Sequence, residues 1–198
     1  MDNEDIRVIK TREALMEALV ELLKVQSLES ISVRDLTKQA RVSRSTFYRN
    51  YIDKYEFLER TMDTLLNGIL EESSSYDGKN IVPSQFYDKF FQYVYKNHVF
   101  FRAFINNDDW PQFKRKLIEN GVKAYKKILS GYEKQIKNNI SVDFLANYII
   151  SAHVGMVSYW LASEDEYSPG NMAKQLRVLT NEGILKAVGL DNILELPC

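Results

Sequence analysis

The sequence predicts an all-α protein with about nine helices. Apolar residues recur at spacings of three and four along most of the 198-residue chain, and this is the period of an amphipathic helix. Serine or aspartate stands just before several of these stretches, where its side-chain oxygen can cap the first amides of a helix. A polar break at 73–80 separates an N-terminal group of helices from a larger C-terminal group.

Two short helices are predicted between residues 32 and 52. Ser32 and Asp35 have the spacing of a capping box at the start of the first helix. The stripe that this helix buries consists of Val33, Leu36 and Ala40. Ser43 caps the second helix, whose single apolar side carries Phe47 and Tyr51. When the two helices pack on each other, their polar side chains remain on one outer surface.

The outer surface predicted for this helix pair carries basic and hydroxyl side chains. On the second helix these are Arg44, Ser45, Thr46, Tyr48 and Arg49. From Arg34 to Lys54, six basic residues stand against two acidic ones, a local balance of +4, although the net charge of the whole chain is −1. A nucleic-acid-binding face needs local positive charge, so the segment indicates a surface that reads double-stranded DNA. The alternative is a solvated helix pair whose basic side chains only keep the surface polar.

A third helix is predicted to begin at residue 53. Asp53 and Glu56 again have the spacing of a capping box, and Lys54 stands in the first turn. Because the amides at a helix N-terminus bind phosphate, we expect this helix start and Lys54 to clamp a phosphate of the DNA.

The run from Val8 to about Leu70 resembles the DNA-binding domain of the TetR family of bacterial transcription regulators. The segments that carry the resemblance are KTREALMEALVELL, SLESISVRDLTKQA, VSRSTFYRNY and DKYEFLERTM. It implies an all-helical homodimer in which an N-terminal three-helix helix-turn-helix domain is followed by a larger helical ligand-binding and dimerisation domain. It further implies that a small molecule releases the protein from a palindromic operator or alters that binding. The segment YWLASEDEYSPGNMAKQLRVL is similar to regulators related to a dihydroxyacetone-kinase operon activator.

The resemblance and the chemistry of the side chains together divide the expected DNA contacts by role. Arg44 and Ser45, near the start of the recognition helix, are placed to meet base edges in the major groove. Arg49 can contact a base or a phosphate. The expected phosphate contacts, which position the protein without reading sequence, are Thr46, Tyr48 and Lys54. The full set of predicted DNA-contacting residues is Ser32, Arg34, Arg41, Ser43, Arg44, Ser45, Thr46, Tyr48, Arg49 and Lys54.

Two positions depart from the family pattern. Arg41 stands between the motif helices, where the family usually has a glycine that turns the chain with a positive φ. A non-glycine residue in that conformation is strained by roughly 1 kcal/mol, and our hypothesis is that Arg41 is kept for a phosphate contact. Asn50 and Tyr51 stand where the family often has two aromatic residues or His-Phe; Tyr51 still suits the core position.

The second half of the chain is predicted to consist of further helices that start near Pro83, Pro111, Val142 and Ser168. We assign residues 1–52 to the helix-turn-helix domain, 53–72 to a connecting helix, and 73–198 to a helical effector-binding and dimerisation domain. Eight basic residues between Lys114 and Lys137 lie opposite an apolar stripe and predict a solvated face; the alternative is a second nucleic-acid patch or a binding surface for an anionic partner.

Small residues on the last two long helices predict the dimer interface, because they let helices approach closely. Two such helices from each subunit form a four-helix interface, as the family resemblance also implies. The predicted interface residues are Ala152, Gly155, Met156, Tyr159, Leu176, Leu179, Gly183 and Ala187.

Aromatic residues are concentrated between Phe86 and Phe113, where eleven of the 24 in the chain occur. Aromatic walls with a few polar tips suit an apolar or aromatic small molecule; the alternative is a core of large rings. For His153, the alternative is an ordinary hydrogen-bonded core histidine. The candidate ligand-binding residues are Phe90, Tyr93, Phe104, Trp110, Tyr125, Tyr148 and His153.

Other functions are disfavoured by the residues that the chain lacks. None of the common sequence signatures of hydrolases, nucleotide-binding enzymes or zinc proteases is found, so we expect no enzyme. With two histidines and one cysteine, Cys198, no metal site or cofactor is expected. No apolar run approaches the ~20 residues of a membrane span, and the acidic N-terminus is unlike a secretion signal; we expect a cytoplasmic protein. An activator controlled by a protein co-regulator and a helical adaptor that binds only protein remain as alternatives.

Overall fold

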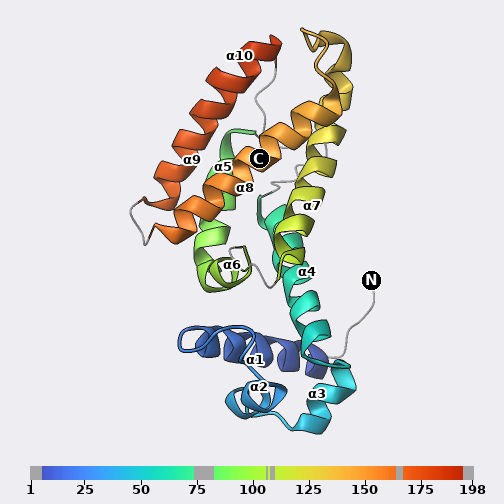
Figure 1. Ribbon diagram of the computed structural model, residues 1–198, viewed down its shortest axis with the longest axis vertical. Helices are drawn as coiled ribbons and strands as arrows, with labels where there is room; N and C mark the ends of the chain where they lie inside the picture. The colour runs from blue at the N-terminus through green and yellow to red at the C-terminus, as the bar shows by residue number, and fades with distance from the viewer. Residues whose placement is uncertain (1–5, 74–82, 106, 108–109, 164–166, 194–198) are drawn as a thin grey trace. The chain divides into compact units, whose positions relative to one another are not determined.

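The computed structural model describes residues 6–73, 83–105, 107, 110–163 and 167–193, and all regular structure in these ranges is helical (Figure 1). The helices are α1 (Ile6–Leu23), α2 (Val33–Gln39), α3 (Arg44–Asn50), α4 (Lys54–Ser73), α5 (Pro83–Lys96), α6 (His98–Ile105), α7 (Gln112–Leu129), the 3-10 turn η1 (Ser130–Gln135), α8 (Val142–Ala162), α9 (Pro169–Val178), the π-helical stretch η2 (Leu179–Ile184) and α10 (Leu185–Val188). Because α9, η2 and α10 are continuous, the described residues form nine helices, and the predicted fold class is confirmed.

The chain separates into two compact units, Met1–Leu65 and Leu66–Cys198, hereafter the N-terminal and C-terminal units. The boundary lies inside α4, within the connecting helix predicted at 53–72. Most of the polar break predicted at 73–80 lies outside the described residues.

The N-terminal unit holds α1, α2 and α3 around the first part of α4 (Figure 1). Its core contains three neighbouring rings: the centroid of Phe47 lies 5.3 Å from that of Tyr51 and 6.0 Å from that of Phe57. Leu15, Leu19 and Leu36 complete the core and are fully buried. Each of these three leucines belongs to the apolar stripe of α1 or α2. The apolar side of α3, which carries Phe47, faces the same core.

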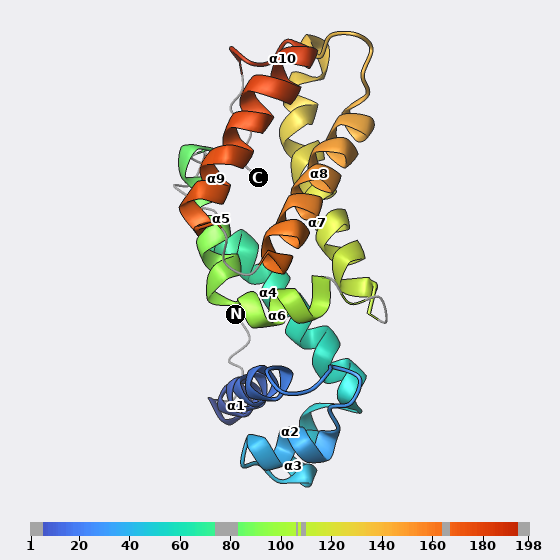
Figure 2. The same cartoon turned by 60° about the vertical axis from the view of Figure 1, so that its left-hand side comes forward.

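The C-terminal unit is built on two helix pairs, α5 with α9 and α7 with α8 (Figure 2). Rings from α5, α6 and α7 fill its interior: Phe101 lies 5.7 Å from Phe113, and Phe104 lies 5.4 Å from the same ring. Trp160 of α8 meets Phe91 of α5 edge to face at 5.2 Å. Edge-to-face packing of this kind adds to the burial of apolar area.

Candidate functional site

The start of α2 is fixed by a reciprocal capping box, as predicted. The Ser32 Oγ accepts a hydrogen bond from the Asp35 amide at 3.2 Å, and the Asp35 carboxylate accepts one from the Ser32 amide at 3.0 Å. The hydrogen bond from the Ser32 hydroxyl, followed by the one from its amide, lowers the pKa of Asp35. Ser32 and Arg34 both lie on the exposed side of this helix start.

The turn between α2 and α3 has the left-handed conformation expected at Arg41, whose φ is 55°. The turn is closed by two backbone hydrogen bonds, from the Arg41 amide to the Lys38 carbonyl and from the Val42 amide to the Thr37 carbonyl. The Arg41 side chain is exposed. A residue with a Cβ is strained in this region, and no hydrogen bond or ion pair among the described residues of this unit accounts for the arginine.

The start of α3 carries a cluster of three hydroxyl groups. Ser43 is the N-cap and accepts a hydrogen bond from the Thr46 amide at 3.0 Å. Its Oγ also lies 2.7 Å from the Ser45 Oγ and 2.8 Å from the Thr46 Oγ1. The hydrogen bonds hold the three hydroxyl groups together at the end of the helix that is predicted to enter the major groove.

The two sides of α3 differ sharply. Phe47 is fully buried, and Tyr51, the C-cap, is 5% exposed. Four predicted DNA-contacting side chains lie on the exposed side of α3: Arg44, Ser45, Tyr48 and Arg49. The arrangement offers positive charge and hydrogen-bond donors along one accessible helix face, as DNA recognition requires.

The start of α4 differs from the predicted capping box. The Asp53 carboxylate accepts from the Glu56 amide at 2.8 Å, as expected, but the Glu56 carboxylate accepts from the Ile52 amide at 2.6 Å instead of from the Asp53 amide. The box is therefore one residue wider. Hydrogen bonding from the Ile52 amide is the main reason that the pKa of Glu56 is lowered.

The Lys54 side chain, for which the sequence predicts a phosphate contact, binds the loop before α2 in this structure. Its Nζ donates to the carbonyl oxygens of Leu28, at 3.2 Å, and Glu29, at 2.9 Å, in the loop before α2. Burial lowers the pKa of Lys54, and the nearby charge of Glu29 opposes this effect.

Two exposed apolar side chains beside α3 were missed by the sequence reasoning. Ile52, in the turn after α3, is 82% exposed, and Tyr55, in the first turn of α4, is 60% exposed. Ile52 lies outside any helix, so helical periodicity gave no signal for it. Tyr55 does belong to a periodic stretch, in which its neighbours Phe57 and Leu58 are fully buried.

Most of the candidate ligand-binding residues are buried rings that pack against other rings. Phe90 packs on Phe86 and Phe91, and Tyr93 packs on Phe101. Phe104 and Trp110 are also buried, whereas Tyr148 is 55% exposed. The rings contact one another as the alternative of an aromatic core predicts. Two of the candidates, Tyr125 and His153, do come together, with ring centroids 6.1 Å apart.

A buried polar triad joins both helix pairs of the C-terminal unit. The Tyr87 hydroxyl of α5 donates to the Thr180 Oγ1 of η2 at 2.9 Å, and His153 Nε2 of α8 lies 3.1 Å from the Thr180 Oγ1 and 3.3 Å from the Tyr87 hydroxyl. Burial lowers the pKa of His153 to about 4, against the opposing effect of the Ile149 carbonyl. The imidazole is thus neutral at physiological pH, as a histidine in an apolar interior must be.

An open apolar groove of about 690 Å³ runs between α8 and the α9–η2–α10 helix. Tyr148 and His153 line it, together with six of the eight predicted dimer-interface residues, Ala152, Gly155, Met156, Leu176, Leu179 and Gly183. Tyr159 is exposed further along α8, and Leu176 is 4% exposed at the inner wall. Ala187 lies in α10. Most of this set therefore shares one face of the C-terminal unit.

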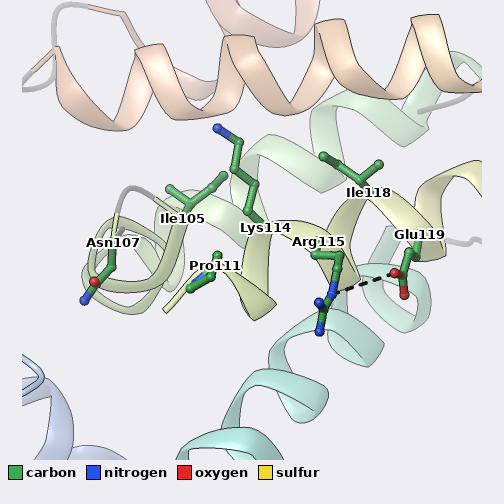
Figure 3. A pocket seen from close by; sticks show the side chains of 7 residues that line it. All are labelled: Ile105, Asn107, Pro111, Lys114, Arg115, Ile118 and Glu119. Atoms are coloured by element: carbon green, nitrogen blue, oxygen red, sulfur yellow. Dashed lines mark ion pairs between the residues drawn. The ribbon is translucent and has the colours of Figure 1, made fainter. Parts of the chain in front are cut away.

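A second hollow, of about 460 Å³, lies at the start of α7 (Figure 3). It is lined by Ile105, Asn107, Pro111, Lys114, Arg115, Ile118 and Glu119. Arg115 and Glu119 form an ion pair at 3.9 Å, and Figure 3 shows the Lys114 side chain pointing away from that pair. None of the candidate ligand-binding residues lines this hollow.

Two further properties concern only the part of the chain that the structure describes. No group of three or more histidine, cysteine or carboxylate side chains there is placed to hold a metal ion. No described helix combines the length and apolar character needed to cross a membrane.

Both units match known protein families. Residues 15–61 match the family described as "Bacterial regulatory proteins, tetR family", and residues 82–182 match the family described as "Transcriptional regulator C-terminal region". A curated relative, the uncharacterized HTH-type transcriptional regulator YxbF of Bacillus subtilis, is 39% identical over 56 residues. That alignment covers 28% of this chain and only 15% of the relative's own length.

Several solved structures share the fold across both units. A TetR-family regulator from Syntrophomonas wolfei has a TM-score of 0.71 at 16% identity, with 93% of this chain and 98% of that chain covered. The dihydroxyacetone kinase operon activator DhaS has a TM-score of 0.66 at 17% identity, covering 91% of this chain and 97% of its own. The fatty acid degradation regulator FadR of Bacillus halodurans has a TM-score of 0.65 at 11% identity, covering 85% and 93%. The family matches cover both the helix-turn-helix and the helices after it, and the chain therefore belongs to the TetR family of DNA-binding transcriptional regulators.

Proposed function

We propose that this regulator is a ligand-responsive repressor that binds a palindromic operator as a homodimer in the cytoplasm. The observation that carries the proposal is the exposed face of α3, where Arg44, Ser45, Tyr48 and Arg49 stand over a buried Phe47. A single helix face of this size reads only a few base pairs. Two copies related by a two-fold axis read two half-sites, which supports a palindromic operator.

Support for the homodimer comes from the exposed apolar side chains along α8 and η2. Phe144 is 68% exposed, Tyr148 is 55% exposed and Leu179 is 58% exposed, and the small residues Ala152 and Gly155 lie between the first two and Tyr159. Contiguous apolar surface of this kind mostly marks an interface in a protein that functions in water. A second copy presenting the same helices would form a four-helix interface.

Support for an apolar or aromatic effector comes from the interior of the C-terminal unit. The triad of Tyr87, His153 and Thr180 lies among apolar and aromatic side chains, and His153 and Thr180 reach the wall of the open groove. Specific ligand sites combine apolar walls with a small number of convergent polar groups. An effector with an apolar body and one hydrogen-bonding group fits such a site.

Repression is proposed over activation because release of DNA by a ligand needs no further contact with a protein partner. The second candidate is an activator, favoured by one similarity: the solved structure of DhaS is described as an operon activator and shares the fold across nearly the whole chain. Transcription from a promoter carrying the operator distinguishes them, because loss of the gene raises expression for a repressor and lowers it for an activator.

The experiment for DNA binding and dimerisation is a gel shift and a footprint on the DNA flanking the chain's own gene, at several salt concentrations. A dimer on a palindrome gives a symmetric footprint and a steep fall in affinity with salt. Absence of binding at low salt contradicts the proposal.

Two glycines offer a matched pair of variants for the dimer. An added Cβ meets no atom within 4 Å at Gly155 of α8 or at Gly131 of η1, so neither site excludes a side chain at its first carbon. We expect Gly155→Arg to give monomers in analytical ultracentrifugation and to weaken operator binding, and Gly131→Arg to do neither. Dimeric Gly155→Arg protein would place the interface elsewhere.

A further inference from the structure

Three hydroxyl groups in the first turn of α3 share their protons in a short chain. The Ser43 Oγ accepts a hydrogen bond from the Thr46 amide at 3.0 Å, and it lies 2.7 Å from the Ser45 Oγ and 2.8 Å from the Thr46 Oγ1. A hydroxyl group has one proton to donate and two lone pairs to accept with. Because the amide already occupies one lone pair of Ser43, one neighbouring hydroxyl must donate to Ser43 and the other must accept from it.

The two outer hydroxyl groups, of Ser45 and Thr46, therefore differ in what they offer to DNA. The one that donates to Ser43 has used its proton and presents only lone pairs. The one that accepts from Ser43 keeps its own proton for a partner outside the protein. Neither makes another hydrogen bond to the described residues, so the direction of the chain decides which of them is the donor.

The position of each hydroxyl group on α3 sets this direction. Ser45 is exposed and lies in line with Arg49, four residues on, along the face expected to meet base edges. Thr46 is half-buried beside the buried Phe47, on the flank of that face. The flank of a helix in the major groove lies next to the phosphates, whose oxygens accept hydrogen bonds. Thr46 must donate to contact a phosphate, and Ser45 then donates to Ser43.

We propose that Ser45 reads the operator as a hydrogen-bond acceptor and recognises an amino group, N6 of adenine or N4 of cytosine. These are the hydrogen-bond donors that the bases present in the major groove. Thr46 has the opposite role, donation to a phosphate, and Ser43 connects the two. The inference rests on the DNA-reading face in the proposed function and is independent of repression, effector and dimerisation.

Base analogues that lack a single functional group test the role of Ser45. Wild-type protein and Ser45→Ala are compared on a duplex that the wild type selects from a randomised pool. Each adenine in turn is replaced by purine and each cytosine by 2-pyrimidinone, which lack the amino group. At the base that Ser45 contacts, the wild type should lose affinity roughly threefold to tenfold, the size of one neutral hydrogen bond. Ser45→Ala should show no such loss there. Weaker base pairing affects both proteins equally, so the double-mutant cycle isolates the contact.

The reverse direction of the chain makes a different prediction. If Thr46 donates to Ser43, the Ser45 proton is free to meet an acceptor, such as O6 or N7 of guanine, N7 of adenine or O4 of thymine. Ser45→Ala would then couple to analogues that lack these acceptors: 2-aminopurine, 7-deazaguanine, 7-deazaadenine and 5-methyl-2-pyrimidinone.

Two substitutions at Thr46 test the other end of the chain. Thr46→Val removes the proton donated to the phosphate, so every duplex should bind roughly threefold to tenfold more weakly. Thr46→Ser should restore the affinity. Thr64→Val is the matched control, because the exposed Thr64 hydroxyl donates to the Arg60 carbonyl of α4 at 2.9 Å, and its loss should leave DNA binding unchanged. Binding is measured below the melting temperature of each variant.

Three results would overturn the proposal. One is coupling of Ser45→Ala to an analogue that lacks an acceptor, which makes Ser45 a donor. Another is the absence of coupling between Ser45→Ala and any analogue, which leaves Ser45 without a base contact. The third is unchanged affinity in folded Thr46→Val, which removes the phosphate contact that sets the direction of the chain. Failure of the wild-type protein to bind any duplex would instead count against the proposed function.

Discussion

The two units of this regulator differ in whether a polar cluster lies in the core. Both have serine-capped helices, at Ser32 and Ser43 in the N-terminal unit and at Ser141 and Ser168 in the C-terminal unit. In the N-terminal unit, Lys54 also binds the loop before α2. In the C-terminal unit a histidine, a tyrosine and a threonine bond to one another inside the apolar core. Helix caps fix the directions of short helices, which suits a rigid reading surface. A buried polar triad instead makes the packing of long helices depend on a few hydrogen bonds.

The largest expected effect tests whether the small core of the N-terminal unit is independent. Phe47 is fully buried and packs on Tyr51 and Phe57, so Phe47→Ala should lower the unfolding free energy by about 3–5 kcal/mol. Hydrogen exchange should show the loss in α1–α3. The matched change Phe101→Ala removes a fully buried ring of the C-terminal unit and should act on α5–α8 instead. Equal loss of protection in both units from either variant would show that they unfold together.

The next effect is the response of the C-terminal unit to acid. The folded pKa of His153 is about 4 against 6.5 for an unperturbed histidine, so the unfolded state binds more protons between these values. Stability is therefore complete above pH 6.5 and falls as the pH drops to about 4, by roughly 3 kcal/mol. Unfolding by denaturant at several pH values should show this slope in the wild type, and His153→Asn should lack it.

The N-terminal unit should respond to acid at lower pH. The pKa of Asp35 lies below its ordinary 3.8, so the stability from its charged form is present above that value and lost as the pH falls through the lowered pKa. Hydrogen exchange at several pH values measures this. If the amides of α2 lose their protection from exchange near pH 6, the two units respond to acid in the same range and the contrast fails.

The sequence predicts a contact well when the interacting residues are close along the chain. The caps at Ser32 and Ser43 and the conformation of Arg41 depend on neighbours within four residues, so residue type and spacing sufficed. The partners of Lys54 lie 25 and 26 residues away, and no local pattern points to them. The phosphate contact of Lys54 stays a prediction, and its contact with the loop before α2 is an addition from the structure.

The C-terminal unit was predictable as helices but not as a site. Periodicity identified the span of α8, yet it could not tell that Tyr148 is exposed while His153, five residues on, is buried beside Thr180. The π-helical stretch η2, which carries Thr180, shifts the register of the last helix and has no signature in the apolar spacing. Aromatic residues were correctly located as a group, but only their packing decides whether they enclose a space.

A smaller effect concerns the packing of α4 within the C-terminal unit. A Cβ at Gly68 would clash with the Tyr93 hydroxyl oxygen and ring edge, so this ring packs directly on the helix backbone. Gly68→Ala should lower the unfolding free energy by about 1–3 kcal/mol through overpacking. Tyr93→Phe should relieve part of that loss, which a double-mutant cycle measures. Gly170→Ala of α9 is the control, since its Cβ also meets nothing within 4 Å and Gly170 is not among the predicted interface residues; this variant should not lower the unfolding free energy.

The smallest expected change in stability is at Arg41, where stability and DNA affinity should change in opposite directions. Arg41 has a φ of 55°, and Arg41→Gly should raise the unfolding free energy by up to about 1 kcal/mol because glycine adopts this conformation without strain. If Arg41 contacts a phosphate, the same variant should bind DNA more weakly and its salt slope should fall by about 0.9 per subunit. Thermal melting and salt-dependent gel shifts measure the two effects separately.

Asn139 provides the comparison for Arg41 in the other unit. Its φ is 54°, but asparagine tolerates this conformation better than arginine does, so Asn139→Gly should change stability less. It lies in the turn before α8 and should leave DNA binding unchanged. The two turns have nearly equal φ but would then differ in function. Only in the N-terminal unit would the glycine variant be more stable and bind DNA more weakly. If Arg41→Gly is more stable and binds DNA as tightly as the wild type, the strain at Arg41 serves no contact with DNA, and the hypothesis for this residue fails.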